Sequence, residues 1–113
     1  CLSDNIGLIT AYSNDLSYNE VFSEQVKNLL YEGDLLITLS GSGNSENVVK
    51  ATNVANEMKV NTLTICGYDG GRLKQVSKNS VWIRSNDMQL CEDAQTVFGH
   101  MVMKSLCGEC LYI

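Results

Sequence analysis

The stretch of residues 35–50, LLITLSGSGNSENVVK, constrains the fold more than any other part of the chain. Its opening run, residues 35–40, is short and apolar and predicts a buried strand, while the amphipathic run that starts at Glu46 predicts a helix. A loop of glycine, serine and asparagine joins the two. Such a strand–loop–helix unit forms an anion site, because free backbone N–H groups and the positive end of the helix dipole point the same way.

The composition of this loop, residues 40–45, suits a phosphate group. Gly41 and Gly43 allow the backbone to approach a ligand closely. Serine hydroxyls are donors without charge, which fits a phosphate that stays in place while chemistry occurs elsewhere on the molecule. The candidate phosphate-binding residues are therefore Ser40, Ser42, Asn44 and Ser45. The alternative is a plain strand–helix turn in which the serines cap the helix.

Two better-known phosphate loops are excluded by the residues that follow the glycines. A P-loop needs a lysine directly after its last glycine, and the first lysine here is Lys50. A dinucleotide fingerprint needs a third glycine, and Glu46 stands at that position. The loop is therefore neither of these two motifs.

Hydrophobic periodicity predicts strands that alternate with helices, and hence a parallel sheet. We expect helices over residues 19–30, 46–58, 72–77 and 93–107, and strands over 35–40, 61–67 and 80–84. Residues 7–12 fit either a short strand or a buried helical turn, and a loop is expected from Asn14. In the last helix, the residues expected to face the core are Ala94, Val97, Phe98, Met101 and Val102.

Because ligands of parallel sheets sit outside the carboxyl ends of the strands, three loops should meet at the site. They are residues 40–45, residues 67–71 and the segment after Arg84.

Size and composition describe a globular chain of one domain at most, residues 1–113. Hydrophobic residues make up 44% and charged residues 19%, which argues against disorder. The net charge of −5 argues against nucleic acid as a partner. No run approaches the roughly 18 apolar residues of a membrane span and no secretory signal is visible, so we expect a cytoplasmic protein without membrane contact.

The five cysteines have no regular spacing and do not predict a disulfide framework. Cys66 closes an apolar strand and is expected to be a small buried hydrophobe. Cys107 and Cys110 form a single C-x-x-C pair, and zinc usually needs a second pair. Since residues three apart share a helix face, packing explains this pair equally well.

Four segments together resemble the sugar isomerase (SIS) domain family, and most of all its phosphoheptose isomerases. They are TLSGSGNSENVVKA at residues 38–51, NDLSYNEVFS at residues 14–23, GYDGG at residues 67–71, and residues 92–100. The resemblance implies a three-layer αβα fold of flavodoxin-like or Rossmann-like topology. Two strands and a helical segment of the family precede the equivalent of Ser3, and the chain opens with Cys1, so we expect an N-terminally truncated SIS domain.

The resemblance implies aldose–ketose isomerisation of a sugar phosphate such as sedoheptulose 7-phosphate, through an enediol. This reaction needs an acid and a base. His100, the only histidine, matches a functional histidine of the family and is a candidate catalyst or metal ligand. Glu92 stands where the family usually has glutamine, and it is a second candidate for catalysis or metal binding. In a continuous helix the two lie about 12 Å apart, so Glu92 either precedes the helix or faces another part of the pocket.

Other residues complete the candidate site or depart from the family pattern. Asp4 and Asp69 match family positions near the pocket, although each can also shape its turn by accepting backbone hydrogen bonds. Gln89 replaces an aspartate that the family often has, and the early helix that carries a histidine and a glutamate is absent. Zinc therefore remains a candidate cofactor, and the resemblance implies no other cofactor.

The alternative to an isomerase is a non-catalytic SIS module. Such a module would bind a phosphosugar, or dock a partner protein, without turnover. The family implies a homo-oligomer, a dimer or a tetramer. Without the missing segment, the apolar strand at residues 35–40 should become a sheet edge, which also favours association.

Overall fold

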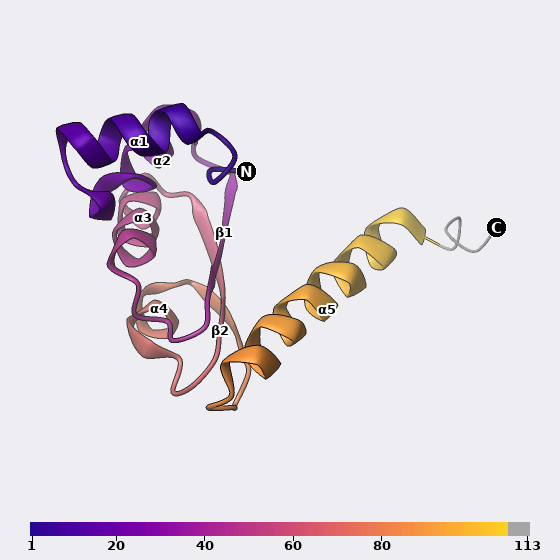
Figure 1. The fold of residues 1–113 in the computed structure, drawn as a ribbon. Helices are drawn as coiled ribbons and strands as arrows, with labels where there is room; N and C mark the ends of the chain where they lie inside the picture. The colour runs from indigo at the N-terminus through magenta and orange to yellow at the C-terminus, as the bar shows by residue number, and fades with distance from the viewer. Residues whose placement is uncertain (109–113) are drawn as a thin grey trace.

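The computed structural model describes residues 1–108, and their centre is a parallel three-stranded sheet with the order β1-β2-β3 (Figure 1). The strands are β1 (Leu35–Ser40), β2 (Asn61–Cys66) and β3 (Asn79–Trp82). Helix α3 (Glu46–Glu57) connects β1 to β2, and helix α4 (Gly71–Val76) connects β2 to β3. The predicted α/β class and parallel sheet are confirmed.

Three helical segments precede the sheet: α1 (Ile6–Asp15), the 3-10 turn η1 (Tyr18–Glu20) and α2 (Ser23–Leu29). The segment left open as strand or helical turn is a ten-residue helix, and the side chain of Asn5 caps it by accepting from Leu8 N. The loop expected from Asn14 was therefore wrong, since the helix continues through Asp15. The single helix expected over residues 19–30 is also interrupted between η1 and α2.

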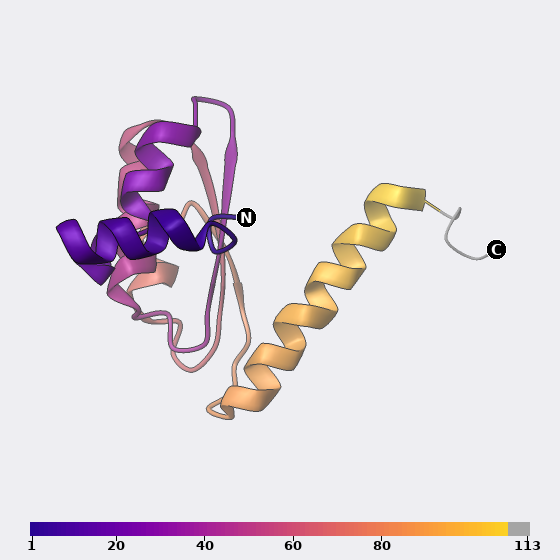
Figure 2. The ribbon, with the colours of Figure 1, turned by 45° about the horizontal axis from the view of Figure 1, so that its top comes forward.

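The helices α1 to α4 all lie on one face of the sheet (Figures 1 and 2). The main core forms between this helical layer and β1, which turns alternate side chains inward. Its buried members come from α2, α3, β1 and the turn before β2: Val26, Leu36, Ala51, Ala55 and Val60. This core fixes α3 against the sheet and so fixes the loop that begins the helix.

The opposite face of β1 carries Leu35, Ile37 and Leu39, which are 52%, 52% and 54% exposed. A strand that is apolar on both faces is typical of a sheet covered on both sides. The strand order also places β1 at an edge of the sheet, as expected. In the described part of the chain, one helix lies on the opposite side of the sheet from the other helices, and this helix diverges from the sheet (Figure 2).

That helix is α5 (Met88–Cys107), which begins five residues earlier than predicted because Asp87 caps it by accepting from Leu90 N at 3.2 Å. Its start is anchored to the body, where Cys91 is buried. The prediction that its apolar residues face the core was wrong for Val97, Met101 and Val102, which are 56%, 62% and 39% exposed. Within residues 1–108, no helix combines the length and apolar character needed to cross a bilayer.

Candidate functional site

The candidate site lies at the carboxyl ends of the strands, where the loops after β1 and β2 touch. The N–H of Gly67 donates to the carbonyl of Gly41 at 2.7 Å, and the N–H of Leu73 donates to the carbonyl of Gly43 at 2.9 Å. The segment after Arg84 joins them, because the N–H of Tyr68 donates to the carbonyl of Ser85 at 2.8 Å. The predicted meeting of three loops is confirmed.

The close approach of the first two loops depends on Gly43. Its φ is +71°, which is the left-handed region that L side chains rarely adopt. A β-carbon at Gly43 would overlap the carbonyl oxygen of Gly70 and lie 2.7 Å from the Gly70 carbonyl carbon. Only glycine therefore allows this loop to pack against the turn after β2.

The three serines lie within this loop, and the backbone hydrogen bonds that Ser40 and Ser42 make leave their hydroxyl hydrogens unused. Ser40 Oγ accepts from Gly43 N at 3.1 Å, and Ser42 Oγ accepts from Asn44 N at 3.2 Å. The hydroxyls of Ser40 and Ser45 are 3.4 Å apart. A hydroxyl that accepts a hydrogen bond keeps its own hydrogen for a ligand, so both functions are compatible.

Ser45 is the N-cap residue of α3, but its hydroxyl makes no capping hydrogen bond. Capping by this serine was the alternative explanation for the loop, and the observed geometry does not favour it. The N–H groups of Glu46 and Asn47 open the helix and have no intrahelical acceptor. They are the donors from which a helix N-terminus builds an anion site.

Asn44 holds the loop to α4. Its Oδ1 accepts from Arg72 N at 3.1 Å, and its carbonyl accepts from Arg72 Nη2 at 3.2 Å. The same guanidinium pairs with Glu46 at 2.5 Å. This Arg72 clamp was missed by the sequence analysis, because no local pattern links residues 28 positions apart.

The two candidate aspartates differ in their surroundings. Asp69 Oδ1 accepts from Gly71 N at 3.0 Å, which is the turn-shaping role offered as an alternative in the sequence analysis. Asp4 is exposed in the turn before α1, where its backbone N–H donates to the carbonyl of Cys1 at 3.3 Å. Asp69 therefore stabilises the turn after β2, and Asp4 keeps its carboxylate exposed.

His100 and Glu92 both lie on α5 and are exposed. Because the helix is continuous from Met88, their positions are about 12 Å apart along its axis. Among residues 1–108, no three His, Cys, Asp or Glu side chains converge as a metal site would require. Zinc takes four ligands, so the described residues do not form a zinc site by themselves. Cys110 of the C-x-x-C pair lies outside them.

The Cys66 thiol closes β2 beside the site and is fully buried. Burial raises the pKa of this thiol, because a thiolate is disfavoured away from water. A thiol that stays protonated is a poor nucleophile. The expectation that Cys66 is a small buried hydrophobe is confirmed.

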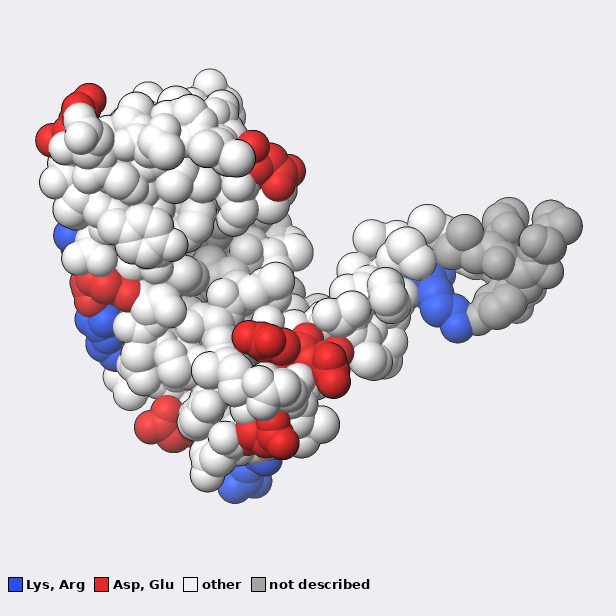
Figure 3. Space-filling view, in the orientation of Figure 1, with Lys and Arg blue, Asp and Glu red and all other residues white. Residues whose placement is uncertain are grey.

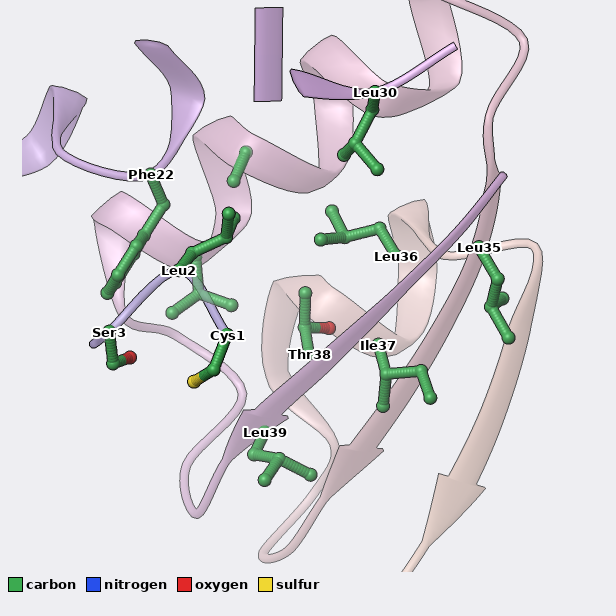
Figure 4. Close-up of a pocket in the computed structure, with 12 residues that line it drawn as sticks. Cys1, Leu2, Ser3, Phe22, Leu30, Leu35, Leu36, Ile37, Thr38 and Leu39 are labelled. Carbon is green, nitrogen blue, oxygen red and sulfur yellow. The ribbon is translucent and has the colours of Figure 1, made fainter. Parts of the chain in front are cut away.

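A separate apolar cavity of about 370 Å³ runs along the free edge of β1 (Figure 4). Leu36 and Thr38 point to the helix side of the strand, while Leu35, Ile37 and Leu39 point to the other. None of the loop serines lines it. It is therefore not the phosphate site.

The comparisons with known proteins agree with this geometry. A family model described as "SIS domain" matches residues 2–67, which is more than half of the chain. The chain therefore belongs to the SIS domain family.

Its relatives include proteins named phosphoheptose isomerase. The one from Helicobacter pylori (strain ATCC 700392 / 26695) is 37% identical over 101 residues, which are 89% of this chain and 53% of the relative. The one from Clostridium acetobutylicum is 37% identical over 112 residues, 96% of this chain and 57% of the relative. The chain thus spans little more than half the length of these relatives.

Solved structures give the same result for the fold. A phosphoheptose isomerase from Neisseria gonorrhoeae superposes with a TM-score of 0.87 at 29% identity, over 88% of this chain and 57% of that one. A phosphoheptose isomerase from Francisella tularensis gives a TM-score of 0.86 at 24% identity, over 88% and 54%.

Proposed function

We propose that this chain is the core of a phosphosugar isomerase that interconverts an aldose and a ketose, with a substrate such as sedoheptulose 7-phosphate. The observation that carries the proposal is the serine loop at the N-terminus of α3, where hydroxyls and helix N–H groups gather on one loop. The names of the relatives support the same reaction class.

In this proposal, Ser40, Ser42 and Ser45 hold the phosphate with neutral donors. Hydrogen bonds to a charged oxygen contribute about 1.5–3 kcal/mol each. Asn44 holds the loop in shape, and Asp69 holds the adjoining turn. Asp4 is a further candidate for contact with the sugar.

The reaction moves a proton between two neighbouring carbons through an enediol, so an acid and a base must reach both carbons. We assign the acid–base role to His100, with Glu92 as a second group that binds a sugar hydroxyl. Zinc, if the complete protein uses it, would polarise the sugar oxygens. His100 and Glu92 would contribute at most part of its ligand set.

A non-catalytic SIS module is the second candidate. What favours it is that no three His, Cys, Asp or Glu side chains converge within residues 1–108, and that the candidate acid–base groups His100 and Glu92 are exposed about 12 Å apart along α5. Such a module would bind a phosphosugar, or a partner protein, without turnover.

The two candidates are separated by assaying full-length protein against a panel of ketose phosphates, with and without zinc. Turnover of a seven-carbon ketose phosphate supports the enzyme. Binding of the phosphosugar by calorimetry without any turnover supports the module. Absence of both refutes the phosphate-site assignment.

We also propose that the protein is cytoplasmic and works as a homo-oligomer, a dimer or a tetramer. The half-exposed apolar residues on β1 and α5 support self-association, because monomeric proteins rarely expose large contiguous apolar patches.

A further inference from the structure

A second pocket, of about 340 Å³, lies at the carboxyl ends of β2 and β3. Its volume falls in the range of pockets that hold small molecules. No residue of the serine loop lines it, so it is separate from the candidate phosphate site. Its walls come from the turn after β2, the end of β3 and the segment that follows: Tyr68, Asp69, Trp82, Arg84, Ser85 and Asn86. We propose that this pocket, the β3 pocket, binds a zwitterionic α-amino acid, with Asp69 at its ammonium group and Arg84 at its carboxylate.

Asp69 and Arg84 bring opposite charges to the same pocket without pairing with each other. Within residues 1–108 neither side chain takes part in an ion pair, and both residues are exposed. Asp69 Oδ1 accepts from Gly71 N at 3.0 Å, and an ionised carboxylate has further acceptor sites beyond that bond. The Arg84 guanidinium lies 4.8 Å from the ring centroid of Trp82 and, among the described residues, donates no hydrogen bond. Both charges are therefore available to a ligand.

The presence of one acid and one base in the lining selects the class of ligand. A simple anion would face the Asp69 carboxylate and a simple cation would face the Arg84 guanidinium, and a like charge in the site disfavours binding. An α-amino acid carries both charges on one carbon, so its ammonium and carboxylate can meet opposite charges together. A guanidinium also binds a carboxylate through two parallel N–H groups. Both signs of charge are visible at the lower end of the body, where α5 departs (Figure 3).

A second cation lies near the pocket but is directed elsewhere. Lys74 Nζ is 3.3 Å from the ring centroid of Trp82, a cation–π contact that places its charge on the indole. Lys74 is not among the residues that line the β3 pocket. The charges that a ligand meets directly in the pocket are therefore those of Asp69 and Arg84.

Two aromatic side chains give the pocket an apolar part. Trp82 Nε1 donates to the carbonyl of Tyr68 at 3.0 Å, so the polar atom of the indole is already satisfied. What both rings then offer a ligand is mainly apolar surface. This surface favours an amino acid whose side chain is apolar, such as leucine.

Tyr68 holds a strained backbone conformation within these walls. Its φ is +50°, in the left-handed region that is unfavourable for a residue with a side chain. Its N–H donates to the carbonyl of Ser85 at 2.8 Å and its carbonyl accepts from Trp82, so both other wall segments hold it in place. Strained residues of this kind cluster at ligand sites. The walls are thus fixed before a ligand enters, which lowers the entropic cost of binding.

The test uses Trp82, which is the only tryptophan of the chain and lines the pocket. Its fluorescence is followed while L-leucine is titrated into the 113-residue chain. We expect a saturable change with a dissociation constant in the millimolar range, because so small a ligand makes few contacts. Two matched ligands each lack one charge: isocaproate lacks the ammonium group, and isoamylamine lacks the carboxylate. Each should bind at least tenfold more weakly than leucine.

Substitutions assign each charge of the ligand to its partner. In Asp69→Asn, which keeps an acceptor for Gly71 N, leucine should bind no more tightly than isocaproate binds the wild type. In Arg84→Gln, leucine should bind no more tightly than isoamylamine binds the wild type. The matched control is Lys59→Gln, which removes an exposed charge just before β2, at the opposite end of that strand from the pocket. It should leave the affinity for leucine unchanged.

The proposal is overturned if leucine produces no saturable change, or if either substitution in the pocket leaves its affinity unchanged. It is also overturned if isocaproate or inorganic phosphate binds as tightly as leucine, which would indicate an anion site, or if D-glucose does, which would indicate a site for neutral hydroxyl compounds. The comparison of ligands on the wild type stands even if a variant fails to fold. None of these measurements involves turnover or the serine loop, so the inference can fail while the isomerase assignment holds.

Discussion

The substitution Gly43→Ala tests how the two loops of the site are held together. Gly43 has a φ of +71° and lies against the carbonyl of Gly70. Alanine adds one methyl group, which brings two separate penalties. The first is the strain of a left-handed backbone at a residue with a side chain, and the second is the overlap of the new methyl group with the turn after β2.

The magnitude follows from these two terms. Left-handed backbone costs a residue with a side chain about 1–2 kcal/mol. Forcing an extra methyl group into a packed contact costs about 1–3 kcal/mol. We therefore expect Gly43→Ala to lower the free energy of unfolding by about 3 kcal/mol, which is a large share of the roughly 5–15 kcal/mol of a typical domain. Phosphosugar affinity should fall as well, since the loop must shift.

The assay is urea unfolding followed by circular dichroism, with two matched glycine controls. Gly33 also has a positive φ, +99°, but a β-carbon there meets nothing within 4 Å, so Gly33→Ala reports the backbone term alone. Gly99 lies in α5 with nothing within 4 Å, so Gly99→Ala should stabilise the chain by about 0.5–1 kcal/mol. If Gly43→Ala destabilises no more than Gly33→Ala, the loops are not in the close contact described above.

Three further predictions follow from other contacts. Lys50 holds the pKa of Glu20 below its ordinary value of 4.5, so this carboxylate stabilises the fold above that pH, and the contribution is lost as the pH falls through the lower folded pKa. The stability deficit of Glu20→Gln should therefore be present at pH 7 and vanish in acid titrations once the pH lies below the lowered folded pKa. Arg72→Ala should weaken phosphosugar binding several-fold in calorimetry, because the loop at Asn44 loses its clamp, and unchanged affinity would show that the clamp is irrelevant to the ligand. In full-length protein, His100→Asn should abolish isomerisation and leave binding largely intact, whereas wild-type turnover would assign His100 a structural role.

The strands and the loop were predictable because their signals are local. The apolar run of β1, the glycines after it and the amphipathic pattern of α3 all lie within a few residues of one another. The segment before Asn14 was ambiguous because a short apolar run fits both strand and helix, and the cap at Asn5 decided for helix.

What the sequence analysis missed depends on tertiary context. The apolar pattern of α5 correctly predicted a helix, but the expectation that Val97 and Met101 face the core was wrong. A periodic apolar pattern identifies the apolar face of a helix. It does not identify which part of the protein packs against that face. The contact between Arg72 and Asn44 joins distant positions and leaves no periodic trace. The roles of His100 and Glu92 stay predictions.

Phosphate binding by the serine loop is tested by calorimetric titration of sedoheptulose 7-phosphate into the wild-type protein and into the triple variant Ser40→Ala, Ser42→Ala, Ser45→Ala. Sedoheptulose without its phosphate serves as the matched ligand control. If the serine loop holds the phosphate, the wild type binds the phosphate ester and not the free sugar, and the triple variant binds the ester at least tenfold more weakly. Equal affinity of the triple variant for the ester, or equal affinity of the wild type for both ligands, would contradict it.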